Sequence, residues 1–406
     1  MAIDFLQIRE QIKKLGENAL LRDRRLKELR SKALELLKDP VLDLDRLHHK
    51  VQLVVHNYDP NLRCALPVLE TGEHINSLAA RFPLPNLPPH ATILATDGSQ
   101  ISPDRHAEVN FSVINVGAIQ AELGSPSAPQ VSIQSHLLYD DELRTDSGIL
   151  TDARLALARD LNERQRLTEL ATQAKSPVLS FTDGPMELWG GREGESVSEY
   201  QKSLDHYVDT LRQLCNLGVA TAGYVDKPGA TLVVRLLEVA LTSEEELPGI
   251  KKYFPLRGLI DIDLYRGLIE PGERSAVFAI QSKFAPYYQD DLALHFFYLN
   301  VGRTDHPWLA RVEIPGWVAN DQRMIDDLHA TLVQQCQIMG KRPYPYLLHR
   351  AHEAAVVSME EKEQITQMIT IELRNRGAEV GEISHKQASK GLGGRKSYSR
   401  GDKTKT

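Results

Sequence analysis

The chain lacks several features that identify common classes of protein. It has only three cysteines in 406 residues, and their wide separation predicts neither a disulfide framework nor a cysteine metal site. No apolar stretch approaches the length of a membrane span, and the amino terminus has no basic start followed by an apolar signal core. We therefore expect a protein of the reducing cytoplasm with no membrane partner.

Two loop signatures of catalysis are also missing. No Gly-x-x-x-x-Gly-Lys-Ser/Thr loop occurs, so the sequence predicts no ATP site of its own, and no Gly-x-Ser-x-Gly elbow indicates a serine hydrolase. The net charge of −7 excludes a global basic field, so any contact with nucleic acid must use local patches. A hydrophobic content of 42% remains typical of a globular protein, and the length allows two or three domains.

The order of the expected elements predicts an α/β protein with a mixed sheet flanked by helices and an N-terminal helical extension. We expect the helical extension over residues 1–88, the α/β domain over 89–385 and a disordered tail over 386–406, where seven Lys or Arg face one Asp. Strands are expected over 91–96, 108–119, 130–138, 177–182, 218–225, 292–301 and 309–314, and helices over 3–38, 152–174, 199–216, 321–338 and 345–376.

Two of the expected strands end in the same tripeptide, Thr-Asp-Gly. Each is a short apolar run, and the tripeptides place Asp97 and Asp183 at the strand ends. Two such carboxylates on neighbouring strands would suit a hard divalent cation such as Mg²⁺ or Mn²⁺. Asp-Gly is also a common turn dipeptide, so a plain turn remains the alternative at either position.

A two-metal site usually needs a third carboxylate, and the helix before Asp183 offers Glu163 and Glu169. Helical phase places Glu163 on the stripe of Leu167 and Leu170, whereas Glu169 points away from it. A carboxylate among core residues is costly unless it is paired or binds a metal, so Glu163 is the stronger candidate. A glutamate that reaches the surface at the rim of the helix is the alternative.

Late in the chain, a Tyr-Pro-Tyr segment leads into a helix that carries His349 and His352. Phase aligns His352 with Leu348 and Ala355, which predicts an inward-facing side chain. Such a histidine beside an acidic site could ligate a metal, position a water or protonate a leaving oxygen. A hydrogen-bonded core histidine is the alternative. The pattern His-x-x-His-Glu is not the zinc protease motif.

The N-terminal helix combines an apolar stripe with a basic surface. Between Arg9 and Lys32 it holds nine basic and four acidic residues, which would suit a phosphate-facing or partner-facing helix or an ordinary solvated face. The stripe, which is too short to form a core alone, predicts a docking element. It consists of Phe5, Ile8, Ile12 and Leu15.

The ordered set of motifs resembles the NurA nucleases, the partners of HerA-type ATPases in DNA end processing. The resemblance covers roughly residues 90–360. Its main pieces are Ala-Thr-Asp-Gly-Ser at 95–99, Arg-Asp-Leu-Asn-Glu at 159–163 and Phe-Thr-Asp-Gly-Pro at 181–185, with weaker pieces at 222–224, 311–315, Tyr344 and His352.

This resemblance implies an RNase H-like core, cleavage of DNA with Mn²⁺ or possibly Mg²⁺, a homodimer and a HerA-like hexameric ATPase as partner. Carried over by position, it makes Asp97, Glu163 and Asp183 the ligands of two metal ions and adds Tyr344 and His352 as catalytic residues. Two alternatives stay open. One is a non-catalytic subunit of the same fold that binds DNA or a translocase, and the other is a metal hydrolase of small phosphoesters.

Overall fold

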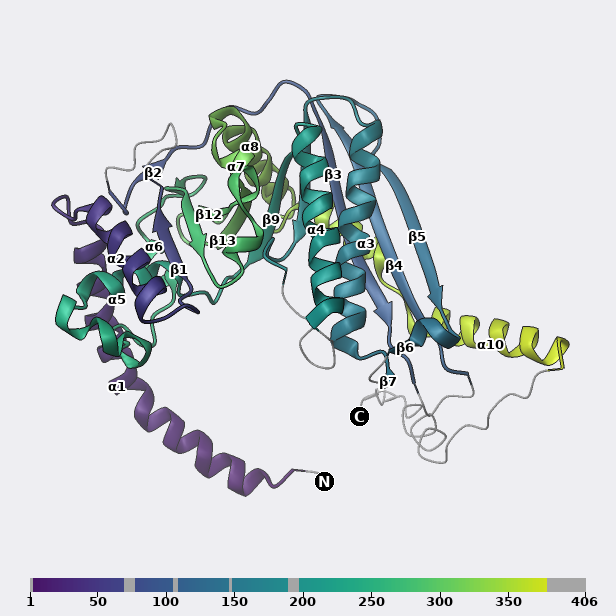
Figure 1. Ribbon diagram of the computed structural model, residues 1–406, viewed down its shortest axis with the longest axis horizontal. Coiled ribbons are helices and arrows are strands. Elements are labelled where there is room, and N and C mark those ends of the chain that lie inside the picture. Colours follow the sequence, from purple (N-terminus) through teal and green to yellow (C-terminus); the bar gives the residue numbers. More distant parts are fainter. Residues whose placement is uncertain (1–2, 69–76, 105–108, 146–147, 189–196, 378–406) are drawn as a thin grey trace, which may run out of the picture.

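The computed structural model describes residues 3–68, 77–104, 109–145, 148–188 and 197–377 (Figure 1). Its helices are α1 (Phe5–Leu37), α2 (Leu44–Asn57), α3 (Asp152–Gln173), α4 (Val197–Asn216), α5 (Leu232–Leu241), α6 (Asp261–Tyr265), α7 (Gly316–Ala319), α8 (Gln322–Ile338), α9 (Tyr346–Ala355) and α10 (Met359–Asn375). Its strands are β1 (Cys64–Pro67), β2 (Arg81–Phe82), β3 (Ala91–Ile101), β4 (Ser112–Leu123), β5 (Gln130–Leu138), β6 (Arg144–Thr145), β7 (Gly148–Ile149), β8 (Val178–Asp183), β9 (Ala220–Asp226), β10 (Arg274–Ser275), β11 (Phe278–Gln281), β12 (Leu294–Asn300) and β13 (Leu309–Pro315).

One large mixed sheet organises the molecule. Its five-strand part has the order β5-β4-β3-β8-β9, in which β4 is antiparallel to both neighbours while β3, β8 and β9 are parallel. This is the strand order of an RNase H-like sheet, so the predicted fold class is confirmed. Beyond β9 the sheet continues with β13, β12, β11 and β1, all antiparallel to their neighbours.

Helices cover both faces of the five-strand part. Figure 1 shows α3 and α4 side by side on one face, and α9 packs on β3 and β4 from the other. The central strands are apolar runs because both their faces are covered. The first six residues of β3 and every residue of β12 and β13 are buried.

Local signals fix where the flanking helices begin. The hydroxyl of Thr151 accepts a hydrogen bond from the Arg154 backbone N–H at the start of α3. At the start of α10, Ser358 and Glu361 form a reciprocal capping box. Such caps satisfy N–H groups that have no partner inside the helix.

The elements differ from the sequence expectations in several places. Strand β3 continues through Asp97 to Ile101, so the strand end expected at Asp97 was wrong. The helix expected over 345–376 is broken after Ala355, where Val356 adopts an extended conformation, and resumes as α10. Several elements were not predicted, among them helices α2 and α5 and strands β1 and β11.

The N-terminal part is attached to the rest of the sheet. The carboxyl-terminal half of α1 packs on the body through Ala33 and Leu37, while its first half extends into solvent (Figure 1). Strand β1 pairs with β11 and so joins the main sheet. The proposed domain boundaries stay predictions, and the tail 386–406 lies outside the described residues.

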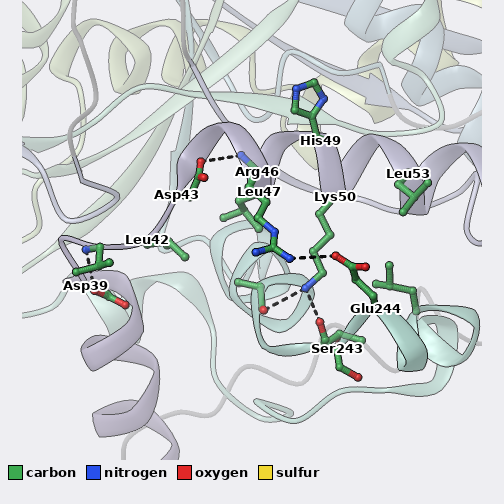
Figure 2. Close-up of a pocket in the computed structure, with 14 residues that line it drawn as sticks. Asp39, Leu42, Asp43, Arg46, Leu47, His49, Lys50, Leu53, Ser243 and Glu244 are labelled. Atoms are coloured by element: carbon green, nitrogen blue, oxygen red, sulfur yellow. Dashed lines mark hydrogen bonds and ion pairs between the residues drawn. The ribbon is translucent and has the colours of Figure 1, made fainter.

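A cavity with a volume of about 800 Å³ lies in this N-terminal part. Figure 2 shows that the basic side chains at this cavity already have partners. Arg46 pairs with Glu244, and the Lys50 ammonium donates to the carbonyls of Ala240 and Thr242 at the carboxyl end of α5. None of the acids singled out by the sequence lines it. None of the described helices is long and apolar enough to cross a membrane.

Candidate active site

Asp97 lies within β3, where its side chain faces α9. One of its carboxylate oxygens, Oδ2, is 2.7 Å from Nδ1 of His352. The His352 side chain is 60% exposed, so the inward-facing histidine expected from helical phase was wrong. The residue lies in the last turn of a ten-residue helix and reaches along the sheet surface to Asp97 instead of into the core.

Close packing of α9 on the sheet brings these two residues together. A Cβ atom at Gly117, the residue opposite Asp97 on β4, would lie 2.6 Å from the Ala351 carbonyl oxygen, so only glycine allows this approach. The end of α9 is also tied down, because the Asn115 amide donates to the Ala355 carbonyl oxygen at 2.8 Å. The Ser99 hydroxyl donates to the same oxygen.

Glu163 approaches the same strand from the opposite face of the sheet. Its Oε1 would lie 2.6 Å from a Cβ atom at Gly98, so the missing side chain of Gly98 makes room for the carboxylate. Glu163 is buried, and it pairs with Arg159 on α3 at an Nε–Oε1 distance of 3.2 Å. Burial, together with the charges of Asp160 and Asp97, raises the pKa of Glu163 to about 8.

Glu169 occupies a different surface of α3. Its carboxylate pairs with Arg166 at 3.1 Å and remains partly exposed. Arg166 in turn donates to the Ser132 hydroxyl of β5. The structure therefore brings Glu163, and not Glu169, into electrostatic contact with Asp97.

Asp183 is the last residue of β8, as predicted, and contacts Tyr344 from the segment before α9. The Tyr344 hydroxyl donates to Asp183 Oδ1 at 2.8 Å, and its ring packs edge-on against Tyr224. Burial raises the pKa of Asp183, the hydrogen bond from Tyr344 opposes this rise, and the charge of Asp97 adds to it. Asp97 thus acts electrostatically on both other acids.

A set of buried groups fixes the segment that follows Asp183. The Met186 N–H donates to the Glu313 carboxylate at 2.7 Å, and the Tyr207 hydroxyl donates to the Met186 carbonyl oxygen. Arg164 donates to the Thr182 hydroxyl just before Asp183. Sequence reasoning missed these supporting residues, since each contact joins residues that are far apart in the sequence and no local pattern marks it. Arg159 could have been found, because it precedes Glu163 by one helical turn.

The donor chemistry of these residues fits a hard divalent cation, because three carboxylates come from three different elements and influence one another. Each carboxylate has a separate protein partner: His352, Arg159 or Tyr344. Within the part of the chain that the structure describes, no three His, Cys, Asp or Glu side chains already form a group that could hold a metal.

Comparison with known proteins identifies the family. Residues 91–357 match the NurA domain, and this segment contains all five predicted site residues. The chain belongs to the NurA family. Its match begins at the first residue of β3 and ends just after α9, so it spans the RNase H-like strands and the helix that carries His352. No curated protein matches the chain in sequence.

Solved structures add distant likenesses. The NurA nuclease from Sulfolobus solfataricus is 12% identical, with a TM-score of 0.44 over 73% of this chain and 88% of that chain. Endonuclease V from Ciona intestinalis is 13% identical, with a TM-score of 0.30 over 68% of this chain and 87% of that one. Because these scores are low, the family assignment depends on the match to the NurA domain.

Proposed function

We propose that this NurA family member is a divalent-metal-dependent deoxyribonuclease that uses Mn²⁺, or Mg²⁺ in its place, in DNA end processing during double-strand break repair. The observation that carries the proposal is the electrostatic coupling of Asp97 to both Glu163 and Asp183 within the NurA domain. A cation beside Glu163 and Asp183 would favour their ionised forms against the charge of Asp97, which raises the pKa of both. A divalent cation is the natural partner of three carboxylates.

Asp97, Glu163 and Asp183 would hold two ions. When bound, such ions supply charge stabilisation and a water of lowered pKa for attack on the phosphodiester. Tyr344 keeps the Asp183 carboxylate oriented through its 2.8 Å hydrogen bond. Arg159 performs the same task for Glu163.

His352 would handle the proton. With Nδ1 donating to Asp97, its Nε2 is the nitrogen left to accept a proton. The exposed ring can reach a substrate from solvent, which a core histidine could not. We assign it to orienting the attacking water or protonating the leaving oxygen.

The proposed partners are DNA, a second copy of the chain and a HerA-like hexameric ATPase. Resection needs an external motor because the sequence contains no phosphate-binding loop for ATP. We propose α1 as the docking element, since its Phe5, Ile8, Ile12 and Leu15 are all exposed in the half that extends away from the body. The three free, dispersed cysteines agree with a cytoplasmic location.

The assembly is tested by mass. Light scattering after size-exclusion chromatography should give about twice the 45.6 kDa chain mass, and the cognate ATPase should co-elute and stimulate cleavage. The variant Ile8→Asp/Ile12→Asp should lose co-elution while retaining cleavage by the nuclease alone. A monomer that ignores the ATPase would refute the assembly but leave the nuclease proposal intact.

Activity is tested with labelled single-stranded DNA in Mn²⁺ and in EDTA. We expect cleavage only with the metal. DNA binding without cleavage in any divalent metal would favour the non-catalytic subunit, and hydrolysis of nitrophenyl phosphate without DNA cleavage would favour a small-phosphoester hydrolase. Either result would overturn the proposal.

A further inference from the structure

An aromatic and basic patch lies beside the carboxylates, at the carboxyl end of β9. It consists of Lys227, which follows β9, and Trp308, which precedes β13. Neither is one of the five predicted site residues. The pairing of Ala310 with Asp226 brings these two strand ends together. The patch adjoins the active site through β9. Asp183 pairs with Tyr224, two residues before Asp226 at the end of that strand, and the Tyr224 ring packs edge-on against Tyr344.

The indole ring of Trp308 is held in place by its polar edge. Its Nε1–H donates to Asp226 Oδ1 at 2.7 Å, and its backbone N–H donates to Asn300 Oδ1 at 3.3 Å. The Val301 N–H donates to the Trp308 carbonyl oxygen at 2.9 Å, which closes the loop between the two strands. The ring is nevertheless partly exposed. A partly exposed aromatic ring held in one orientation offers a flat apolar face for stacking.

Lys227 places a charge over this ring. Its ammonium nitrogen lies 3.8 Å from the centroid of the Trp308 ring, within the range of a cation–π contact. The residue is exposed and has a φ of 43°, in the left-handed region that L side chains rarely adopt. Strained residues of this kind cluster at functional sites.

We propose that Trp308 and Lys227 form a subsite for one nucleotide of single-stranded DNA next to the cleaved phosphodiester. A base stacks on the indole, and the flexible Lys227 side chain moves from the ring to an adjacent phosphate. Exposed Arg303, in the same loop as Trp308, adds positive charge nearby. An unpaired base is required, because the bases of a duplex have no free face along the strand. This inference rests on the proposed nuclease function.

Asp226 explains why the subsite directs a phosphate to Lys227. Its carboxylate anchors the indole N–H and repels a phosphate from that edge of the ring. The ammonium of Lys227 is the cation positioned over the ring face. Base and phosphate thus have separate partners, as in binding sites for single strands that combine aromatic rings with basic side chains.

The first test measures binding of a fluorescein-labelled oligothymidylate by anisotropy, in EDTA so that no cleavage occurs. Trp308→Ala should weaken binding by about 5- to 100-fold, the range for loss of one stacked base, whereas Trp308→Phe should stay within about threefold of wild type. Lys227→Gln should reduce the slope of log binding constant against log salt concentration by about 0.7, the value expected for one phosphate contact with a single strand. Exposed Lys252→Gln, on a distant surface, is the matched control and should change neither.

The second test uses intrinsic fluorescence and does not depend on a truncated side chain. Unlabelled oligothymidylate should quench wild-type tryptophan emission, and Trp308→Phe should remove that quenching. A duplex of equal length should produce much less quenching. Equal binding by wild type and Trp308→Ala, or quenching that persists in Trp308→Phe, would overturn the subsite.

These outcomes separate the subsite from the nuclease proposal. Binding that depends on Trp308 in a protein that never cleaves DNA would refute the nuclease alone. If the protein cleaves DNA but its affinity for DNA does not change on substitution of Trp308, the subsite alone would be refuted.

Discussion

His352 Nδ1 lies 2.7 Å from Asp97 Oδ2, although 255 positions separate the two residues in the sequence. The contact exists because Gly117 lets α9 lie directly on the sheet. It orients the imidazole and leaves Nε2 available for proton transfer. His352 is therefore the residue on α9 whose removal should affect the chemical step.

We predict that His352→Ala lowers the single-turnover cleavage rate by about 10²-fold or more, the usual contribution of a positioned acid or base. His349→Ala is the matched control on the same helix. His349 lies near Glu353, at 3.4 Å, and not at Asp97, so its loss should change the rate little. Equal effects of the two substitutions would contradict the assignment.

Tyr344→Phe should weaken metal affinity more than it weakens the chemical step. Burial already raises the pKa of Asp183, and the Tyr344 hydrogen bond opposes that rise, so removing the hydroxyl leaves a more readily protonated ligand. The Mn²⁺ concentration for half-maximal cleavage should rise by about tenfold, as for other residues that orient metal ligands. Tyr346→Phe, two residues further on, should leave it unchanged. A changed rate at saturating Mn²⁺ with unchanged metal affinity would contradict this role.

Glu163→Gln should abolish cleavage, whereas Glu169→Gln should remain active. The two residues lie on different faces of α3, and only Glu163 is coupled to Asp97. The glutamine retains the size of the buried side chain, so circular dichroism should show an intact fold. An inactive Glu169→Gln beside an active Glu163→Gln would reverse the assignment.

Gly98→Ala should impair cleavage without removing any functional group. The added Cβ would lie 2.6 Å from Glu163 Oε1 and 2.7 Å from Arg159 Cγ, which must move apart. We expect a rate loss of about tenfold or more, because small displacements of catalytic groups are costly. Gly249→Ala, whose Cβ would meet nothing within 4 Å, is the control and should cleave normally.

Stability should depend on pH through His329 in α8. Burial lowers the pKa of His329 to about 4, below its usual 6.5, so the unfolded chain binds the extra proton between these values. The free energy of unfolding should therefore fall as the pH drops from 6.5 to 4, by on the order of 3 kcal/mol from this residue. His329→Gln, which can still donate to the Gly272 carbonyl, should flatten the profile measured by urea unfolding. Exposed His49→Gln should leave it unchanged.

The sequence predicted much of the fold because its strands are strong apolar runs bounded by turn residues. It placed Asp183 at the end of its strand for this reason. The prediction ended the strand of Asp97 too early, because Asp-Gly is a common turn dipeptide. In the structure β3 continues because it pairs with β4 and α3 packs on it. Tertiary contacts of this kind leave no local signal.

The candidate site was predicted in part for the same reason. Helical phase correctly predicted that Glu163, and not Glu169, lies on the buried face of its helix. It did so because a stripe of apolar residues marks that face. Helical phase gave the wrong orientation for His352. This residue lies in the last turn of a short helix, where its side chain lies along the surface of the sheet and not in the core. The support from Glu313 required the structure, since it depends on a contact across 127 positions.

The central claim is that Asp97, Glu163 and Asp183 bind the metal ions that drive cleavage. It is tested most directly by single-turnover cleavage of labelled single-stranded DNA across a Mn²⁺ titration, with wild type compared with Asp97→Asn and Asp183→Asn. We expect metal-dependent cleavage by the wild type and a loss of at least about 10³-fold in each folded variant at saturating Mn²⁺, on the scale of several kcal/mol. Wild-type rates in either variant would contradict the account.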